Sequence, residues 1–122
     1  MKIERFEELD CWQETRKLVK MVYKAVGNGK FSHDSRLRDQ ITGAAISTMN
    51  NIAEGFTSQS NVELKRFLKY SRRSTAEVQS CLYVAVDQNY LPESEFVKLY
   101  EQAEKARQLI DGFLRYLRTK RT

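Results

Sequence analysis

Five basic residues lie close together between positions 65 and 73, with no acidic residue among them. They are Lys65, Arg66, Lys69, Arg72 and Arg73. On an α-helix, which turns by about 100° per residue, their side chains would form one strip along two to three turns. Such a basic strip predicts electrostatic contacts to the phosphates of a nucleic acid. The alternative is a solvated helix face without a partner.

Two apolar residues, Phe67 and Leu68, stand between these cations in the sequence. On a helix they would point away from the basic strip and toward the core of the protein. No aromatic platform for base stacking is therefore expected within the strip. The sequence predicts that a nucleic acid would be held mainly by its backbone.

A second group of basic residues lies at the C-terminal end of the chain: Arg115, Arg118, Lys120 and Arg121. We predict that Arg115 and Arg118 add phosphate contacts to those of the strip. The alternative role is local, because cations in the last turn of a helix complement the partial negative charge of its C-terminal end.

No group of residues in the sequence has the spacing of a catalytic or metal site. Glu54 and Glu77 have no histidine or nucleophile beside them, so ion pairs or caps are their expected roles. The only histidine, His33, is expected in an exposed loop. Cys11 and Cys81 lie among apolar neighbours, which predicts buried, reduced thiols rather than a disulfide or a metal site. We expect a protein that is not an enzyme and has no cofactor.

The composition fits one compact domain spanning residues 1–122. The chain carries a formal net charge of +5, which favours an anionic partner, and it contains only five glycines and one proline. So few turn-forming residues argue against a fold with many strands. No apolar run is long enough to cross a membrane, so we expect a soluble, cytoplasmic protein.

Apolar residues recur at three- and four-residue steps through most of the chain, which predicts helices. These are expected at about residues 5–26, 33–55, 61–88 and 93–118. Gly27 and Gly29 would end the first helix in the left-handed conformation, and Ser60 with Glu63 would form a capping box at the start of the third. Helices of this length with short connections predict an all-α fold, an up-down-up-down antiparallel four-helix bundle.

The segment from Gln40 to Phe56 is expected to be the central helix of this bundle. It has two apolar faces and small residues on every side, so neighbouring backbones can come close to it. Ser71 and Ser74 of the third helix are expected to pack against its small residues. Apolar surface on more than one side also exceeds what a monomeric bundle needs.

With these features placed, the chain resembles the four-helix-bundle proteins encoded in intervening sequences of bacterial large-subunit ribosomal RNA genes. The most specific part of the resemblance is the run NIAEG from Asn51 to Gly55. The other residues that carry it are Phe6, Leu9, Trp12, Leu37, Gln40, Ile41, Ala44, Ala45, Ser47, Phe67, Leu68, Ser74, Glu77, Tyr90 and Leu91. Together they span nearly the whole chain.

The resemblance implies a bundle that assembles into a ring-shaped homo-oligomer, with a pentamer as the expected form. A similar bundle is the accessory variability protein of diversity-generating retroelements, which binds nucleic acid and a reverse transcriptase. Six polar residues of the two central helices are expected to hold the bundle or a subunit contact. They are Gln40, Ser47, Asn51, Glu54, Ser74 and Glu77.

The sequence departs from the family pattern where relatives commonly carry cations. Thr42 and Gly43 replace a pair of arginines, Met49 stands where a proline is usual, and residues 57–60 replace a basic stretch. The second helix has therefore lost positive charge. Any phosphate contact is expected to shift to residues 65–73 and to the C-terminal end of the chain.

Two functional hypotheses follow from the sequence. The first is a non-enzymatic, homo-oligomeric bundle that binds RNA or DNA through phosphate contacts of the basic strip. The alternative is a scaffold or accessory subunit that recruits a protein such as a reverse transcriptase. A reverse transcriptase gene and a template repeat beside the gene would favour the scaffold, and a position inside a ribosomal RNA gene would favour the first hypothesis.

Overall fold

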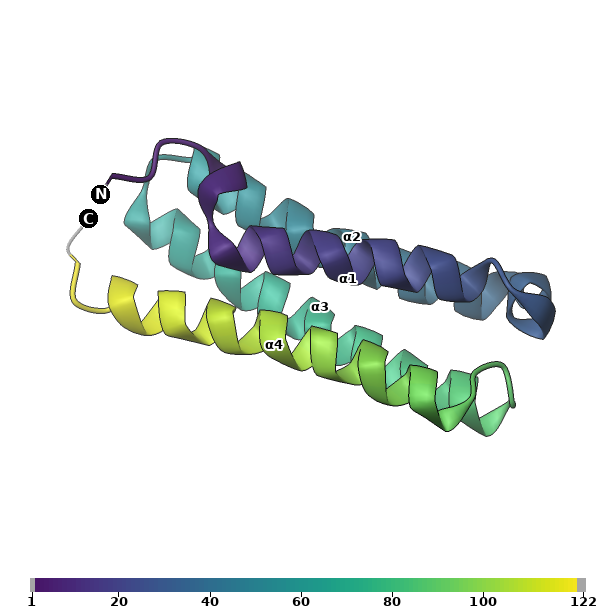
Figure 1. The fold of residues 1–122 in the computed structure, drawn as a ribbon. Coiled ribbons are helices and arrows are strands. Elements are labelled where there is room, and N and C mark those ends of the chain that lie inside the picture. The colour runs from purple at the N-terminus through teal and green to yellow at the C-terminus, as the bar shows by residue number, and fades with distance from the viewer. Residues whose placement is uncertain (1, 121–122) are drawn as a thin grey trace.

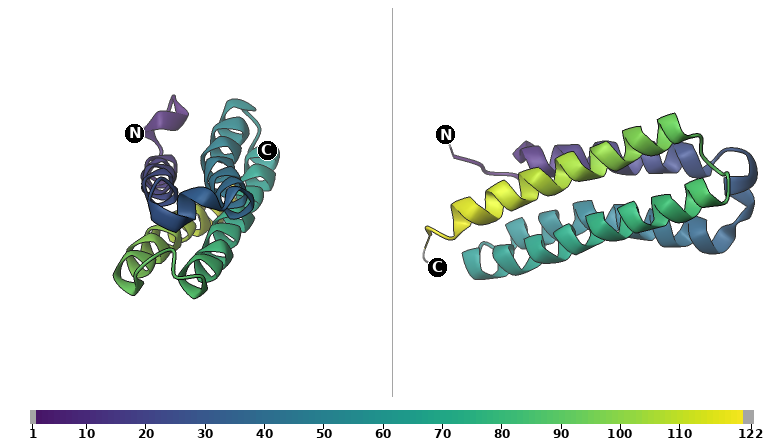
Figure 2. Two further views of the ribbon diagram at one scale, coloured as in Figure 1. Left: turned by 90° about the vertical axis from the view of Figure 1, so that its right-hand side faces the viewer. Right: turned by 90° about the horizontal axis from the view of Figure 1, so that it is seen from below.

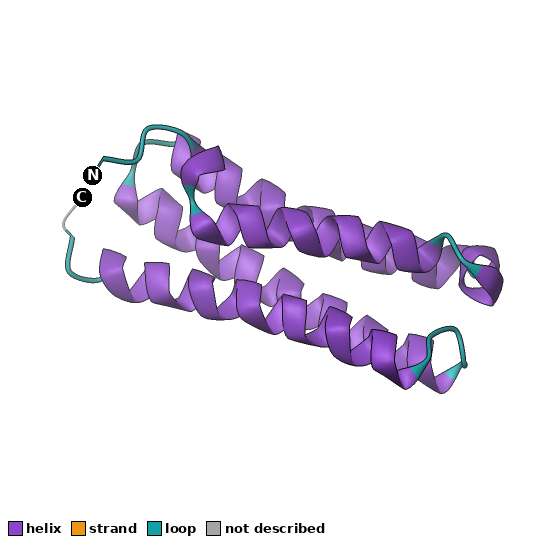
Figure 3. Ribbon diagram, in the orientation of Figure 1, coloured by secondary structure: helices purple, strands orange, loops and turns teal. Residues whose placement is uncertain are grey.

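The structure, a computed structural model, describes residues 2–120 and consists of helices joined by short connections (Figure 1). The α-helices are α1 (Asp10–Val26), α2 (Ser35–Thr57), α3 (Asn61–Asp87) and α4 (Glu93–Leu117), and the 3-10 turns are η1 (Phe6–Glu8) and η2 (Gly29–His33). No strand occurs in this part of the chain (Figure 3), which confirms the predicted all-α class. None of these helices is long and apolar enough to cross a membrane. Arg121 lies outside the described residues.

Successive helices run side by side in alternate directions, so the start of α1 and the end of α4 lie at the same end of the bundle (Figure 1). Seen along its length, the bundle has α1 and α3 at opposite corners, each between α2 and α4 (Figure 2). The predicted four-helix bundle is thus confirmed. One core cluster, which includes Phe31 and Leu91, lies toward the end with the α1–α2 and α3–α4 connections. A second, which includes Leu64 and Leu117, lies toward the chain termini.

The helix ends follow the expected chemistry at some positions and depart from it at others. Asp34 caps α2 by accepting a hydrogen bond from the backbone N–H of Leu37 at 3.0 Å. Gly29 and Asn89 adopt the left-handed conformation, with φ of 52° and 62°. The prediction for Gly27 was wrong, because this residue ends α1 in the right-handed conformation with φ of −80°.

The capping box predicted at the start of α3 is only half formed. Ser60 accepts a hydrogen bond from the backbone N–H of Glu63 at 3.2 Å, as a capping residue should. The carboxylate of Glu63, however, pairs with Arg66 one turn further along instead of turning back to the Ser60 amide. The nearby cation competes for the carboxylate that would have completed the box.

Helices α2 and α3 approach each other closely through small residues, as the sequence predicted. The Ser71 hydroxyl donates to the backbone carbonyl of Thr48 at 2.7 Å, and the Ser74 hydroxyl donates to the Ser47 hydroxyl at 3.1 Å. At Gly55, a methyl group in place of the hydrogen would lie only 2.8 Å from Cβ of Phe67. This glycine was expected near the end of the second helix, but α2 continues to Thr57, and Gly55 serves the contact between the helices.

The second apolar face of α2 is only partly covered within one chain. Ile46, Met49 and Ala53 lie on this face and are half-buried, whereas Ile41 and Ala45 on the core face are almost completely buried. The helix therefore presents apolar surface outside the bundle core, in agreement with the excess expected from the sequence.

Both cysteines are free and buried, as the sequence predicted. Cys11 is 3% exposed and Cys81 is 9% exposed. Burial raises the pKa of the Cys11 thiol to about 12, because the thiolate would lose its hydration. Burial also raises the pKa of Cys81. At neutral pH both side chains are therefore protonated thiols that fill the core.

Candidate nucleic-acid interface

The five cations predicted to form a strip lie together on the outward side of α3. Arg66, Lys69, Arg72 and Arg73 are exposed, and Lys65 is half-buried. The opposite side of the helix carries its buried residues, which include Leu64, Leu68, Ser71, Thr75 and Val78. Packing of that side against α2 and α4 fixes the direction in which the cations point. We refer to Lys65, Arg66, Lys69, Arg72 and Arg73 as the α3 strip.

Two of the five cations already have carboxylate partners. Arg66 pairs with Glu63 at 2.5 Å, and Arg72 pairs with Asp111 of α4 at 3.1 Å. No ion pair within residues 2–120 involves Lys65, Lys69 or Arg73. Three positive charges on one rigid helix are therefore available to an external anion, and the two paired arginines keep donors beyond those used.

Contrary to the prediction from the sequence, aromatic rings do lie beside the strip. Phe67 and Tyr70 are half-buried and make an edge-to-face contact with ring centres 5.7 Å apart. The guanidinium group of Arg66 lies 4.8 Å from the centre of the Phe67 ring, and that of Arg73 lies 5.6 Å from the centre of the Tyr70 ring. The prediction overlooked Tyr70, although its spacing of four residues from Arg66 and three from Arg73 was the available signal.

The second basic group adjoins the strip across the seam between α3 and α4. Arg115 and Arg118 are exposed and follow Asp111 by four and seven residues, so they share the face of α4 that meets Arg72. Leu64 and Leu68 of α3 also pack in one cluster with Leu114 and Leu117 of α4. The structure therefore places Arg115 and Arg118 at the same end of the bundle as the start of the strip.

Carboxylates continue along this seam away from the basic end. Arg107 pairs with both Glu104 and Asp111 on α4, and Gln79 of α3 donates to Glu104 at 3.1 Å. The hydrogen bond from Arg107 is the largest of the effects that hold the pKa of Glu104 below its usual range. On α1, the hydrogen bond from Gln102 has the same effect on the pKa of Glu14. These contacts tie α4 to both of its neighbours.

The lowered carboxyl pKa values predict that acid destabilises the protein. Because the folded state holds the pKa of Glu14 and Glu104 below the ordinary value of 4.5, protons bind more tightly to the unfolded chain. The stabilisation is present above about pH 4.5 and should be lost as the pH falls through the folded-state pKa values. When unfolding by urea is measured between pH 7 and pH 3, the urea concentration at the midpoint should decrease once the pH falls below about 4.5. Equal midpoints at pH 6 and pH 3 would contradict this account.

Five of the six polar residues expected to hold the bundle or a subunit contact make hydrogen bonds to one another. Gln40 donates to Glu77 at 3.3 Å, and the amide of Asn51 donates to the backbone carbonyl and the hydroxyl of Ser47, each at 2.9 Å. The hydrogen bond between the hydroxyl groups of Ser47 and Ser74 connects α2 with α3. Glu54 differs, because its exposed carboxylate makes no hydrogen bond or ion pair with any described residue.

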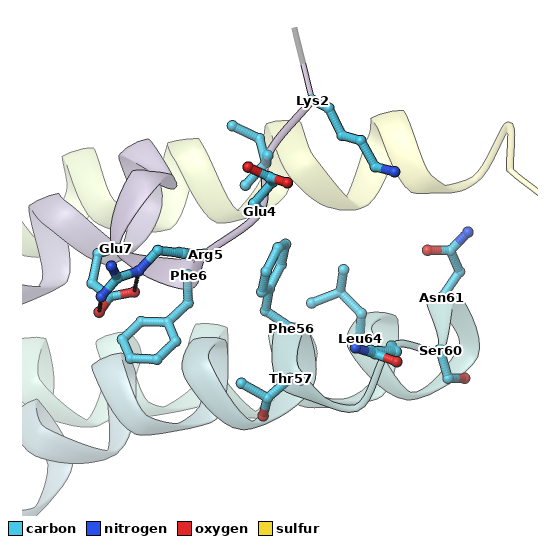
Figure 4. A pocket seen from close by; sticks show the side chains of 13 residues that line it. Lys2, Glu4, Arg5, Phe6, Glu7, Phe56, Thr57, Ser60, Asn61 and Leu64 are labelled. Carbon is cyan, nitrogen blue, oxygen red and sulfur yellow. Dashed lines mark hydrogen bonds and ion pairs between the residues drawn. The ribbon is translucent and has the colours of Figure 1, made fainter.

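A cavity of about 800 Å³ lies between the N-terminal segment and the α2–α3 turn (Figure 4). Its wall combines the apolar side chains of Phe56 and Leu64 with the Arg5–Glu7 ion pair, which has an N–O distance of 2.8 Å. The hydrogen bond from Arg5 lowers the pKa of Glu7, so this carboxyl is ionised rather than poised to donate a proton at neutral pH. The cavity borders the first turn of α3, where the α3 strip begins.

The family model described as "23S rRNA-intervening sequence protein" matches residues 7–112. The α3 strip, Tyr70 and the α2–α3 seam all lie within the matched residues, whereas Arg115 and Arg118 lie beyond them. No curated protein in the comparison matches the sequence.

Proposed function

The chain belongs to the 23S rRNA-intervening sequence protein family, and from this premise we propose that it is a non-enzymatic bundle that binds RNA or DNA through the phosphates. The observation that carries the proposal is the α3 strip, in which Lys65, Lys69 and Arg73 make no ion pair within residues 2–120. Arg115 and Arg118 extend the positive surface across the α3–α4 seam. A helix anchored by a packed core holds these charges in place before the ligand arrives, which lowers the cost of ordering them.

Phosphate contacts of this kind position a nucleic acid without reading its sequence. Lysines act as point charges toward phosphate, and arginines can donate two parallel hydrogen bonds to its oxygens. The ion pairs of Arg66 with Glu63 and of Arg72 with Asp111 hold two of the guanidinium groups along the strip. We therefore expect weak base preference and strong dependence on salt.

The direct test is binding of the purified protein to a fluorescently labelled, structured RNA and to a DNA hairpin of equal length. Fluorescence anisotropy at about 50 mM monovalent salt should show saturable binding, because electrostatic contacts are strong at low ionic strength. An excess of unlabelled heparin, a polyanion without bases, should compete. Absence of binding to both ligands at this salt concentration would overturn the proposal.

We also propose that the chain acts as a homo-oligomer, with a pentamer as the expected form. The half-buried apolar face of α2 formed by Ile46, Met49 and Ala53 supports this, because a second copy could cover it. Light scattering at micromolar concentration should give a mass several times the 14.3 kDa of one chain. A mass of one chain would contradict the proposal. Replacing Met49 by Lys should lower the mass, and the matched exposed change Gln13→Lys on α1 should not.

A second candidate function, a scaffold that recruits a protein such as a reverse transcriptase, is favoured by one surface feature. Tyr83 is 52% exposed and its ring contacts those of Phe96 and Tyr100, and Val97, which follows Phe96 in the sequence, is 42% exposed. Exposed aromatic groups of this kind are common at protein interfaces. The patch lies on α3 and α4 away from the basic end, so one molecule could hold a protein there and a nucleic acid at the α3 strip.

A further inference from the structure

Tyr70 lies on α3 between two arginines, at the edge of the strip. Arg66 precedes it by four residues and Arg73 follows it by three, so all three side chains share one face of the helix. The guanidinium carbons of Arg66 and Arg73 lie 5.5 Å and 5.6 Å from the centre of the Tyr70 ring. Arg66 also donates to the Tyr70 hydroxyl at 3.0 Å. These contacts fix the tyrosine ring and both planar cations relative to one another.

The surroundings of this cluster leave it accessible from solvent. Tyr70 is half-buried, both arginines are exposed, and the ring of Phe67 makes an edge-to-face contact with that of Tyr70. Glu63 forms an ion pair with Arg66. In the part of the chain that the structure describes, the other aromatic cluster of α3, around Tyr83, has no cation over its rings. Tyr70 is therefore the aromatic residue that the strip can use together with its charges.

Rings and guanidinium planes bind nucleobases by stacking, and the contact needs a base whose face is free. In a duplex each base is stacked on its neighbours, so its face is covered. We infer that Arg66, Tyr70 and Arg73 form a stacking site for unpaired nucleobases, which makes single-stranded RNA or DNA the preferred ligand of the α3 strip. This inference rests on the proposed function, because the lysines of the strip must first hold the phosphates.

The positions of the lysines and of Tyr70 allow one set of side chains to bind phosphates while another stacks on a base. Lys69 directly precedes Tyr70, and Lys65 lies one turn before Lys69 on the same side of the helix. A strand whose phosphates follow these lysines can stack one base on the exposed plane of a guanidinium group that itself lies over the Tyr70 ring. Stacking of this kind is tolerant of base identity, since every base has an aromatic face.

Substitutions at Tyr70 and Arg73 test the inference by comparing two ligands. Tyr70→Leu removes the aromatic face and keeps apolar volume, Tyr70→Phe keeps the ring, and Arg73→Lys keeps the charge but removes the planar group. Each variant is measured against a single-stranded oligouridylate and an RNA duplex of the same length. The matched control is Tyr23→Leu, which changes a 50% exposed tyrosine on α1.

The inference predicts that Tyr70→Leu weakens oligouridylate binding by roughly fivefold or more. Duplex binding should change by less than about twofold, because it depends on phosphate contacts that the variant retains. Tyr70→Phe and Tyr23→Leu should behave as the unchanged protein, and Arg73→Lys should lose affinity for the single strand selectively. Equal losses on both ligands, or no loss with Tyr70→Leu and Arg73→Lys, would overturn the inference.

These outcomes separate the inference from the proposal beneath it. If the unchanged protein binds neither ligand, the proposed function fails and the stacking inference fails with it. If it binds both ligands and Tyr70→Leu has no selective effect, only the stacking inference fails. Helix content and urea midpoints of each variant establish that the comparison is made on folded protein.

Discussion

A variant in which the α3 strip is neutralised should lose at least about 100-fold in affinity for RNA at about 100 mM salt. Each phosphate contact that is lost reduces the number of counterions released on binding, and this release contributes to the affinity. The changes are Lys65→Gln, Arg66→Gln, Lys69→Gln, Arg72→Gln and Arg73→Gln. The side chains lie on the outward side of α3, so the packed side of the helix is unchanged. Asp111 keeps a cationic partner, because Arg107 also pairs with it. The loss is measured by fluorescence anisotropy.

A second variant with the same change in charge serves as the control. Five exposed cations of α1 and η2 are replaced by glutamine: Arg16, Lys17, Lys20, Lys24 and Lys30. The long-range attraction that depends on net charge would decrease equally in both variants. Phosphate contacts of the α3 strip would be lost only in the variant with the neutralised strip. Equal weakening of the two variants would show that binding depends on overall charge and would contradict an interface on α3.

Replacing Gly55 by alanine should destabilise the protein by about 1–3 kcal/mol, the usual cost of overpacking a core. The added methyl group would lie 2.8 Å from Cβ of Phe67 and 3.3 Å from Cα of Leu64. The second of these atoms belongs to the backbone, so the contact is relieved only if α2 and α3 move apart. The higher helix propensity of alanine, worth about 1 kcal/mol, offsets part of this loss. Urea unfolding measures the net effect.

Gly43 offers a matched control on the same helix. It is exposed, and a methyl group there would have no heavy atom within 4 Å. Gly43→Ala should therefore stabilise the protein by about 0.5–1 kcal/mol through helix propensity alone. If the Gly55→Ala variant proved as stable as the Gly43→Ala variant, this result would contradict the close approach of α2 and α3 at Gly55.

The helices and the strip were predictable because they depend on local spacing. The steps of three and four residues in the apolar pattern place Leu64 and Leu68 on one side of α3, and the cations then fall on the other. The small residues around Ser47 similarly indicated a close contact, which the hydroxyl pair with Ser74 confirms. For the helices and the strip, one helix and its period were sufficient, and for the contact of Ser47 with Ser74 the small residues on both helices were the signal.

Other contacts between helices were not predictable in the same way. The sequence does not show that Asp111 meets Arg72, because 39 residues separate them. Gly55 was interpreted as a helix end, since its role depends on Phe67 of α3. Tyr70 differs from these cases, because its contacts to Arg66 and Arg73 are local and follow from their spacing along one helix.

The salt dependence of binding tests the central claim most directly. The equilibrium association constant of the unchanged protein for a single-stranded RNA is measured from about 50 to 300 mM monovalent salt. Three unpaired cations, at about 0.7 released ions each, predict a slope of about −2 or steeper in a plot of log K against log salt. In the variant with the neutralised α3 strip this slope should be shallower by about 2, and the residual slope would come from Arg115 and Arg118. A flat line for the unchanged protein would contradict phosphate binding by the strip.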